Sequence, residues 1–140
     1  MGLQLIFVVE TNKRCKSDWI YIKDTIDQFY QYNQAQVKLS PVYMDGKGKY
    51  RNKEKEIGSL ISQYQVTGNA NISKVLFCFD CDDYDTDPED KQFLRGAQQY
   101  CNECCYDFVW FCKDIERVYT GEKVRDSEKK NVATRFKAKN

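Results

Sequence analysis

The chain has 140 residues, a length that fits one domain and that can bury a core without needing disulfides or a structural metal. Its hydrophobic content of 41% and aromatic content of 14% indicate a packed core and exclude an intrinsically disordered chain. The formal net charge of +1 identifies no class of partner, so any functional information in the charges must come from their distribution.

The first predicted element is a strand over residues 3–9, which are almost continuously apolar, as in a strand buried on both faces. No basic segment precedes it and Glu10 closes it, so we interpret it neither as a signal peptide nor as a membrane span. We therefore expect a cytoplasmic protein without a membrane partner. After a polar loop, Ser17 is expected to cap a helix that begins at Asp18. The apolar residues of that helix recur at spacings of three and four: Trp19, Ile22, Ile26, Phe29 and Tyr30.

The second predicted strand covers residues 37–44, and Pro41 within it favours a position at the edge of a sheet. Residues 45–49 have the composition of a basic, turn-rich loop. The apolar spacing that follows predicts a helix over about residues 52–64.

A third strand is predicted over residues 73–79. Pro88 then opens a helix that Asp87 can cap and that continues to about residue 105. Residues 107–112 form the fourth predicted strand, and a short helix or turn is expected over 114–119. We expect residues 1–121 to form the α/β domain and residues 122–140 to form a basic C-terminal tail.

Strands that alternate with helices of this length predict a Rossmann-like, three-layer α/β fold. The order is β-α-β-α-β-α-β, and the four-stranded sheet is expected to be mainly parallel. Right-handed crossovers then place helices on both faces of the sheet.

Four of the seven cysteines have the spacing of a zinc site, Cys78-x2-Cys81 followed by Cys101-x2-Cys104. Cys78 belongs to a strand pattern, however, and residues three apart on a strand point to opposite faces. Cys101 and Cys104 lie at helical spacing. We therefore interpret these thiols as reduced, packed side chains and not as zinc ligands.

Acidic residues follow two of the predicted strands. Glu10 ends the first strand, and Asp80, Asp82 and Asp83 come directly after the third. The carboxyl ends of parallel strands share one edge of the sheet, where ligands of such folds bind, and the usual strand order makes these two strands neighbours. Carboxylates that converge repel one another unless a cation lies between them, and oxygen ligands suit Mg²⁺ or Mn²⁺. The alternative is that the seven acids of residues 80–90 only cap a helix and solubilise a loop.

Basic residues occur in the loops after the first and second predicted strands, on the same edge as the acids. They could hold a phosphate backbone, which makes nucleic acid the expected partner. The residues are Lys13, Arg14, Lys47, Lys49 and Arg51, of which we single out Lys13, Lys47 and Lys49 as phosphate-binding.

The two acidic motifs, Val8-Val9-Glu10 and Phe79-Asp80-Cys81-Asp82-Asp83, resemble those of the Toprim (topoisomerase–primase) domain. The resemblance covers about residues 3–120 and is nearest to the Toprim domains of OLD-type phage-defence nucleases. It implies that Glu10 is a metal ligand and general acid/base, that Asp80 and Asp82 are catalytic metal ligands, and that Asp83 assists in holding Mg²⁺ or Mn²⁺.

The sequence leaves three functions open. The first is a Mg²⁺-dependent nuclease-like or nucleotidyl-transfer domain that acts on nucleic-acid phosphodiesters. The second is a non-catalytic Toprim-like module that binds a nucleotide or a protein partner, since a fold does not fix a function. The third is a metal-dependent phosphatase or phospho-acceptor domain, for which Lys113 would be the lysine that reaches the phosphorylated aspartate.

Overall fold

The computed structural model of the chain describes residues 2–12, 14–80 and 86–111. Its elements follow one another in the predicted order: β1 (Leu3–Val9), α1 (Ser17–Phe29), β2 (Val37–Tyr43), the 3₁₀ helix η1 (Lys47–Lys53), α2 (Glu54–Gln65), β3 (Ile72–Asp80), α3 (Pro88–Cys104) and β4 (Asp107–Phe111). The helix predicted over 114–119 and the tail predicted over 122–140 lie outside the described residues.

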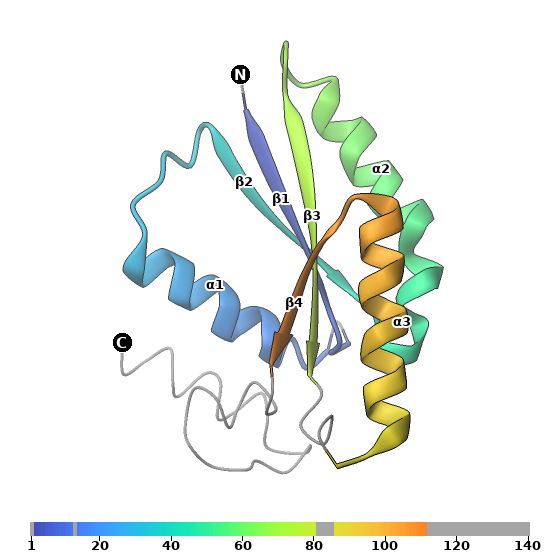
Figure 1. Cartoon of the computed structure of the whole chain (residues 1–140). Helices are drawn as coiled ribbons and strands as arrows, with labels where there is room; N and C mark the ends of the chain where they lie inside the picture. Colours follow the sequence, from blue (N-terminus) through green and yellow to red (C-terminus); the bar gives the residue numbers. More distant parts are fainter. Residues whose placement is uncertain (1, 13, 81–85, 112–140) are drawn as a thin grey trace.

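The four strands form one parallel sheet in the order β2-β1-β3-β4 (Figure 1). β1 lies between β2 and β3, which confirms that the first and third strands are neighbours. β2 is an edge strand, as Pro41 predicted, because a residue without an N–H disturbs a sheet least at its edge. The α/β class and the four-stranded sheet are therefore as expected, and the sheet is parallel throughout.

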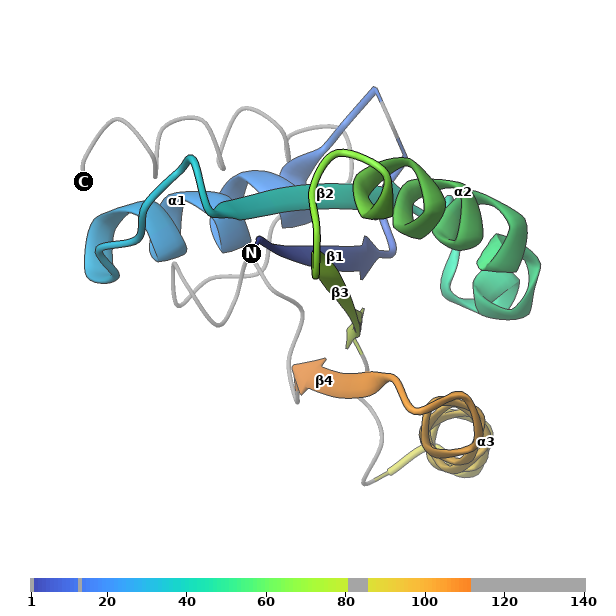
Figure 2. The ribbon, with the colours of Figure 1, turned by 90° about the horizontal axis from the view of Figure 1, so that it is seen from above.

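Helices cover both faces of the sheet, with α1 on one side and α2 and α3 on the other (Figures 1 and 2). The side chains of β1 alternate between two separate apolar cores. Ile6 and Val8 belong to the core under α2 and α3, whereas Phe7 and Val9 pack in the core that includes Tyr21 of α1. This alternation explains why the sequence of β1 is apolar at successive positions, and it confirms a strand buried on both faces.

A polar side chain of β1 is buried beneath α2. Gln4 of β1 is fully buried, and its amide nitrogen donates to Leu60 O at 3.2 Å and to Ser73 Oγ at 3.0 Å. Ser40 Oγ donates to Gln4 Oε1 at 2.7 Å. The three hydrogen bonds of the Gln4 amide thus connect β1 to β2, β3 and α2, one bond to each element.

The segment after β2 is more ordered than the sequence predicted. A loop was expected over residues 45–49, but η1 already begins at Lys47, and Tyr50 within it is buried against Phe79, Phe93 and Tyr100. Burial of this ring favours helical turns over an open loop.

The aromatic cluster around Tyr50 is hydrogen-bonded at its edge to the carboxylate of Glu54. Glu54, the first residue of α2, accepts hydrogen bonds from the hydroxyls of Tyr100 and Tyr106, the latter at 2.7 Å. Burial and the hydrogen bond to Glu54 raise the pKa of both tyrosines above their usual value of 10.0. The bonds connect α2 to α3 and to the start of β4.

The two helix starts differ in how well they were predicted. Asp87 caps α3 as expected, since its Oδ1 accepts the N–H of Glu89 at 2.9 Å and Pro88 occupies the first turn. Ser17 does not cap α1. Lys16 precedes that helix in a left-handed conformation (φ 57°). The loop before it is organised by Asn12, whose Oδ1 accepts the backbone N–H groups of Arg14 at 3.0 Å and Cys15 at 2.9 Å.

The far end of α1 also departs from the apolar pattern. Phe29 and Tyr30 were placed on its apolar face, but they are 78% and 66% exposed. Figure 1 shows that the C-terminal end of α1 lies farther from the sheet than its start, so these two rings have no sheet to cover. Among the described residues, no helix is both long and apolar enough to cross a bilayer.

Candidate functional site

Glu10 lies where the ends of three strands meet. It follows β1 directly, and its Oε1 accepts the backbone N–H of Asp80, the last residue of β3, at 2.8 Å. Its own carbonyl oxygen accepts the N–H of Gly46, from the loop after β2, at 3.0 Å. Two of the four acids that the sequence singled out are therefore brought together, with the Glu10 carboxylate held against the backbone of Asp80.

This position is the topological switch point of the sheet. From the end of β1 the chain crosses to α1 on one face, and from the end of β3 it continues to α3 on the other (Figures 1 and 2). Two adjacent strands whose connections leave in opposite directions open a crevice at their carboxyl ends, which is where folds of this kind bind ligands. Glu10 and Asp80 lie at this point of the sheet.

The remaining predicted acids, Asp82 and Asp83, lie outside the described residues. Within residues 2–12, 14–80 and 86–111, no three His, Cys, Asp or Glu side chains form a group that could hold a metal.

A third acid belongs to this region and was not singled out from the sequence. Asp18, in the first turn of α1, is only 5% exposed. Burial raises the pKa of the Cys78 thiol, and the charges of Asp18, Asp80 and Glu10 raise it further, so all three carboxylates act on one point of β3. In the sequence Asp18 looks like an ordinary acid at a helix N-terminus, and only the fold reveals its burial.

Two hydroxyl groups next to these acids add unused hydrogen-bonding capacity. Thr11 Oγ1 follows Glu10, Ser17 Oγ precedes Asp18, and both atoms are buried without a hydrogen-bond partner among the described residues. Buried hydroxyls are normally satisfied, so such atoms next to these acids in the chain are candidates to contact a bound ligand or an ordered water.

An open pocket of about 500 Å³ lies between the loop after β1 and the segment after β2. Arg14 and Lys53 supply its positive charge, and the other lining residues are Asn12, Tyr43 and Asp45. Because Gly46 donates to Glu10, this pocket shares the edge of the sheet with the acids. Lys53 was not singled out, although it belongs to the basic run of residues 47–55.

The predicted phosphate-binding lysines have different positions. Lys49 does not line the pocket; its Nζ lies 3.9 Å from Asp45 Oδ2, in a solvent-exposed pair of little energetic weight. Lys47 begins η1, and Lys13 lies outside the described residues. The Arg51 guanidinium stacks over the rings of Tyr50 and Tyr100, at 5.3 Å and 5.0 Å from their centroids, on the side of α3.

The cysteines with zinc-like spacing are divided by the sheet. Cys78 packs in the core beside α1, whereas Cys101 packs in the core beneath α2 and α3. Burial raises the pKa of Cys101 to about 11, so this thiol is protonated and packed at neutral pH. Cys81 lies outside the described residues.

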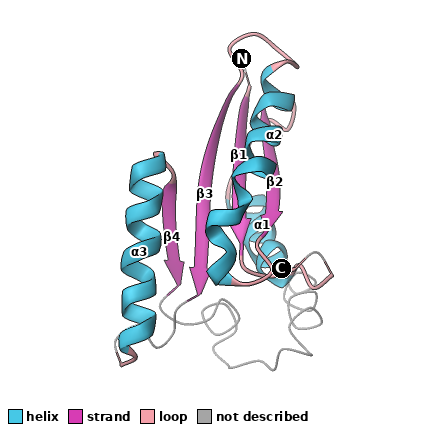
Figure 3. Cartoon of the chain, turned by 90° about the vertical axis from the view of Figure 1, so that its right-hand side faces the viewer, coloured by secondary structure: helices cyan, strands magenta, loops and turns pink. Residues whose placement is uncertain are grey.

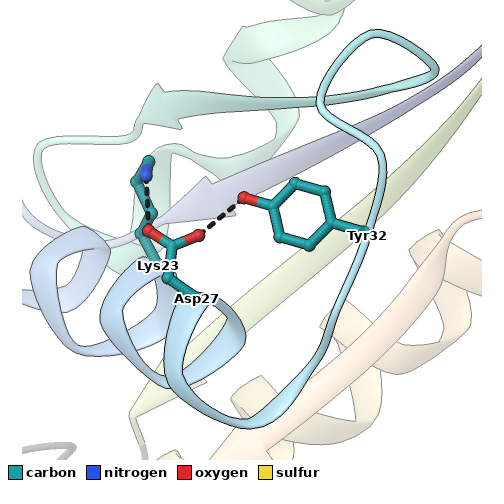
Figure 4. Close-up of polar contacts among 3 residues, drawn as sticks. All are labelled: Lys23, Asp27 and Tyr32. Carbon is teal, nitrogen blue, oxygen red and sulfur yellow. Dashed lines mark hydrogen bonds and ion pairs between the residues drawn. The ribbon is translucent and has the colours of Figure 1, made fainter.

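A second polar cluster occupies the far end of the molecule and does not belong to this edge. Tyr32 donates to Asp27 Oδ1 at 2.6 Å, and Lys23 pairs with Asp27 Oδ2 at 2.7 Å (Figure 4). Lys23 and Tyr32 also line a pocket of about 380 Å³ along the start of β2, that is, at the amino ends of the strands. The hydrogen bond to Asp27 raises the pKa of Tyr32.

Comparison of the chain with the models of known protein families, with curated proteins and with solved structures finds no match in any of the three.

Proposed function

We propose that this chain is a Toprim-like domain that acts on nucleic-acid phosphodiesters with Mg²⁺ or Mn²⁺ at the edge formed by the ends of β1 and β3. The observation that carries the proposal is the hydrogen bond from the Asp80 N–H to Glu10 Oε1, which holds two acidic residues together at the switch point of a parallel sheet. The proposed Toprim-like family comes from the resemblance of the two acidic motifs, and the closeness of Glu10 to Asp80 supports it.

The donor set is chemically suited to such a cation. Glu10 and Asp80 offer carboxylate oxygens, and Asp82 and Asp83 follow within three residues of the strand end. A bound Mg²⁺ would polarise a phosphoryl oxygen and stabilise the leaving oxygen. The chain's own part is to position the substrate and to move a proton: Arg14 and Lys53 hold the phosphate from the adjacent pocket, and Glu10 takes up or returns a proton at its carboxylate.

One observation favours a second candidate, the non-catalytic module that binds a nucleotide or a protein. The bond from Glu10 to a backbone N–H would by itself fasten the end of β1 to β3 and needs no metal. On this reading, Glu10 is a structural residue and the acids near it are caps and surface charges.

The two candidates are separated by calorimetric titration of Mg²⁺ and Mn²⁺ into the wild-type chain and into three variants. Glu10→Gln keeps an oxygen that can accept the Asp80 N–H but removes the charge, and Asp80→Asn/Asp82→Asn removes two proposed ligands. Glu56→Gln makes the same chemical change at an exposed position of α2 and is the matched control.

We expect saturable binding in the wild type and in Glu56→Gln, with the affinity reduced at least about tenfold in the other two variants. Cleavage of a labelled oligonucleotide should require the metal and should be lost in the same two variants. Equal metal binding in all four proteins, or no binding and no cleavage with the oligonucleotide present, would overturn the catalytic proposal and favour the second candidate.

A further inference from the structure

A groove of about 330 Å³ runs between α3 and the outer strand β4. Its walls combine two cations with two aromatic rings: Lys91 and Arg95 lie one turn apart on α3, and Phe108 and Trp110 lie two residues apart on β4. Leu94 and Gln98 complete the lining. Figure 3 shows α3 standing beside β4 along the length of the strand.

The aromatic side of the groove has one half-buried ring and one exposed ring. Phe108 packs against Phe79 of the core, with ring centroids 5.5 Å apart, which fixes its position. Trp110 is 37% exposed and is one of five large hydrophobic side chains at the surface among the residues that the structure describes. A fixed floor with an exposed indole at its end is the arrangement on which a flat aromatic ligand can stack.

The groove leads to the acidic edge. Trp110 is in register with Phe79, the residue immediately before Asp80, and Phe108 is in register with Phe77, farther from that edge. On α3, Lys91 is nearer than Arg95 to the start of the helix, which follows the end of β3. A ligand that follows the groove past Phe108 and Trp110 therefore arrives beside Asp80.

We infer that this groove binds single-stranded nucleic acid, with a base stacked on Trp110 and phosphates held by Lys91 and Arg95. The inference rests on the proposed function, because it names the form in which the substrate reaches the acids. The two cations of α3 face the aromatic rings of β4, so a single strand could place its phosphates against the cations and a base against the rings. A duplex keeps its bases stacked on one another and offers no free base face to Trp110.

Fluorescence tests this directly, because the chain has only two tryptophans, Trp19 and Trp110. In a Trp19→Phe background, Trp110 is the sole indole. An oligo(dT) of about 12 nucleotides, within the length that single-strand sites cover, should quench its emission saturably. The same titration is made with a duplex of equal length and with the mononucleotide dTMP.

Binding of labelled oligo(dT) to variants then assigns the contacts. Trp110→Ala should weaken binding about 5- to 150-fold, the usual effect of removing one stacked base. Tyr30→Ala, which truncates an exposed ring at the end of α1, should leave the affinity unchanged. Lys91→Gln/Arg95→Gln should weaken binding and lower the slope of log K against log salt by about 1.4, whereas Lys23→Gln/Lys55→Gln, with the same change of charge elsewhere, should not.

Three results would overturn the inference: no quenching by oligo(dT), equal affinity for the duplex, or equal binding by dTMP. An unchanged affinity in Trp110→Ala would do so as well. The Asp80→Asn variant distinguishes a failure of the groove inference from a failure of the proposed function. If oligo(dT) binding depends on Trp110 but no metal-dependent cleavage occurs in any variant, the groove stands and the proposed function fails. If cleavage depends on Asp80 but neither cleavage nor binding responds to Trp110, the function stands and the groove inference fails.

Discussion

Replacement of the buried amide of Gln4 should destabilise the fold by a calculable amount. Gln4→Leu keeps nearly the same shape but deletes the bonds to Leu60 O, Ser73 Oγ and Ser40 Oγ. A typical hydrogen bond contributes about 1 kcal/mol net, so the three together contribute about 3 kcal/mol. The greater apolarity of leucine offsets part of this, and we expect a loss of about 2–3 kcal/mol in the free energy of unfolding. For a chain of this size that is a fall in Tm on the order of 10 °C.

The assay is urea unfolding followed by circular dichroism, in which the midpoint should fall while the slope m stays constant. Gln28→Leu makes the same replacement at an exposed position of α1 and should change stability by no more than about 0.5 kcal/mol.

The reasoning also predicts a rescue. Much of the cost of Gln4→Leu comes from the serine hydroxyls that it leaves unpaired, and an apolar replacement of both partners of a hydrogen bond can be nearly neutral. Combining Gln4→Leu with Ser40→Ala and Ser73→Ala should therefore cost at least about 1 kcal/mol less than the sum of the separate changes. Additivity within about 0.5 kcal/mol, or a Gln4→Leu variant as stable as the wild type, would refute the assignment of a cooperative buried network.

Three further outcomes are expected. Asp87→Ala removes the cap of α3 and should lower stability by about 1 kcal/mol in urea unfolding, whereas Asp87→Asn should not. Cys78 should resist a thiol reagent at pH 8 in the folded chain while exposed Cys105 reacts, since burial raises the pKa of Cys78; rapid labelling of Cys78 would contradict its burial. Burial and the bond to Glu54 raise the pKa of Tyr100 above 10.0 in the folded chain. The protonated phenol therefore contributes fully to the free energy of unfolding below pH 10, and this contribution is lost as the pH rises through the pKa of the folded chain. Glu54→Gln should lower the pKa of Tyr100, which an absorbance titration of the phenolate detects; an unchanged midpoint would argue against the bond to Glu54.

The local patterns predicted the fold well because each one reports short-range physics. Asp87 and Pro88 predicted the start of α3, since a cap and a fixed φ need only neighbouring residues. Pro41 predicted an edge strand because a missing N–H is tolerated there. The predicted cap of α1 was wrong, although the helix begins within one residue of the expected position: Ser17 does not cap it, and Asn12 Oδ1 accepts N–H groups of the preceding loop instead.

The candidate site was predicted less fully, because it is assembled from segments that are far apart in the chain. The pairing of β1 with β3 could be expected, and with it the approach of Glu10 to Asp80. The burial of Asp18 and the place of Lys53 in the pocket depend on how a helix and a loop settle on the sheet. No periodicity in the sequence carries that information.

The interior position of β1 has a consequence for how the protein is made. This strand leaves the ribosome before its neighbours β2 and β3, which are completed only at Tyr43 and Asp80. Until then, the most apolar segment of the chain has two open backbone edges and two uncovered faces, the condition in which nascent strands associate with other chains. Folding of the sheet must therefore wait until β3 has been synthesised, and its efficiency in the cell should depend on the rate of translation and on chaperones that shield residues 3–9.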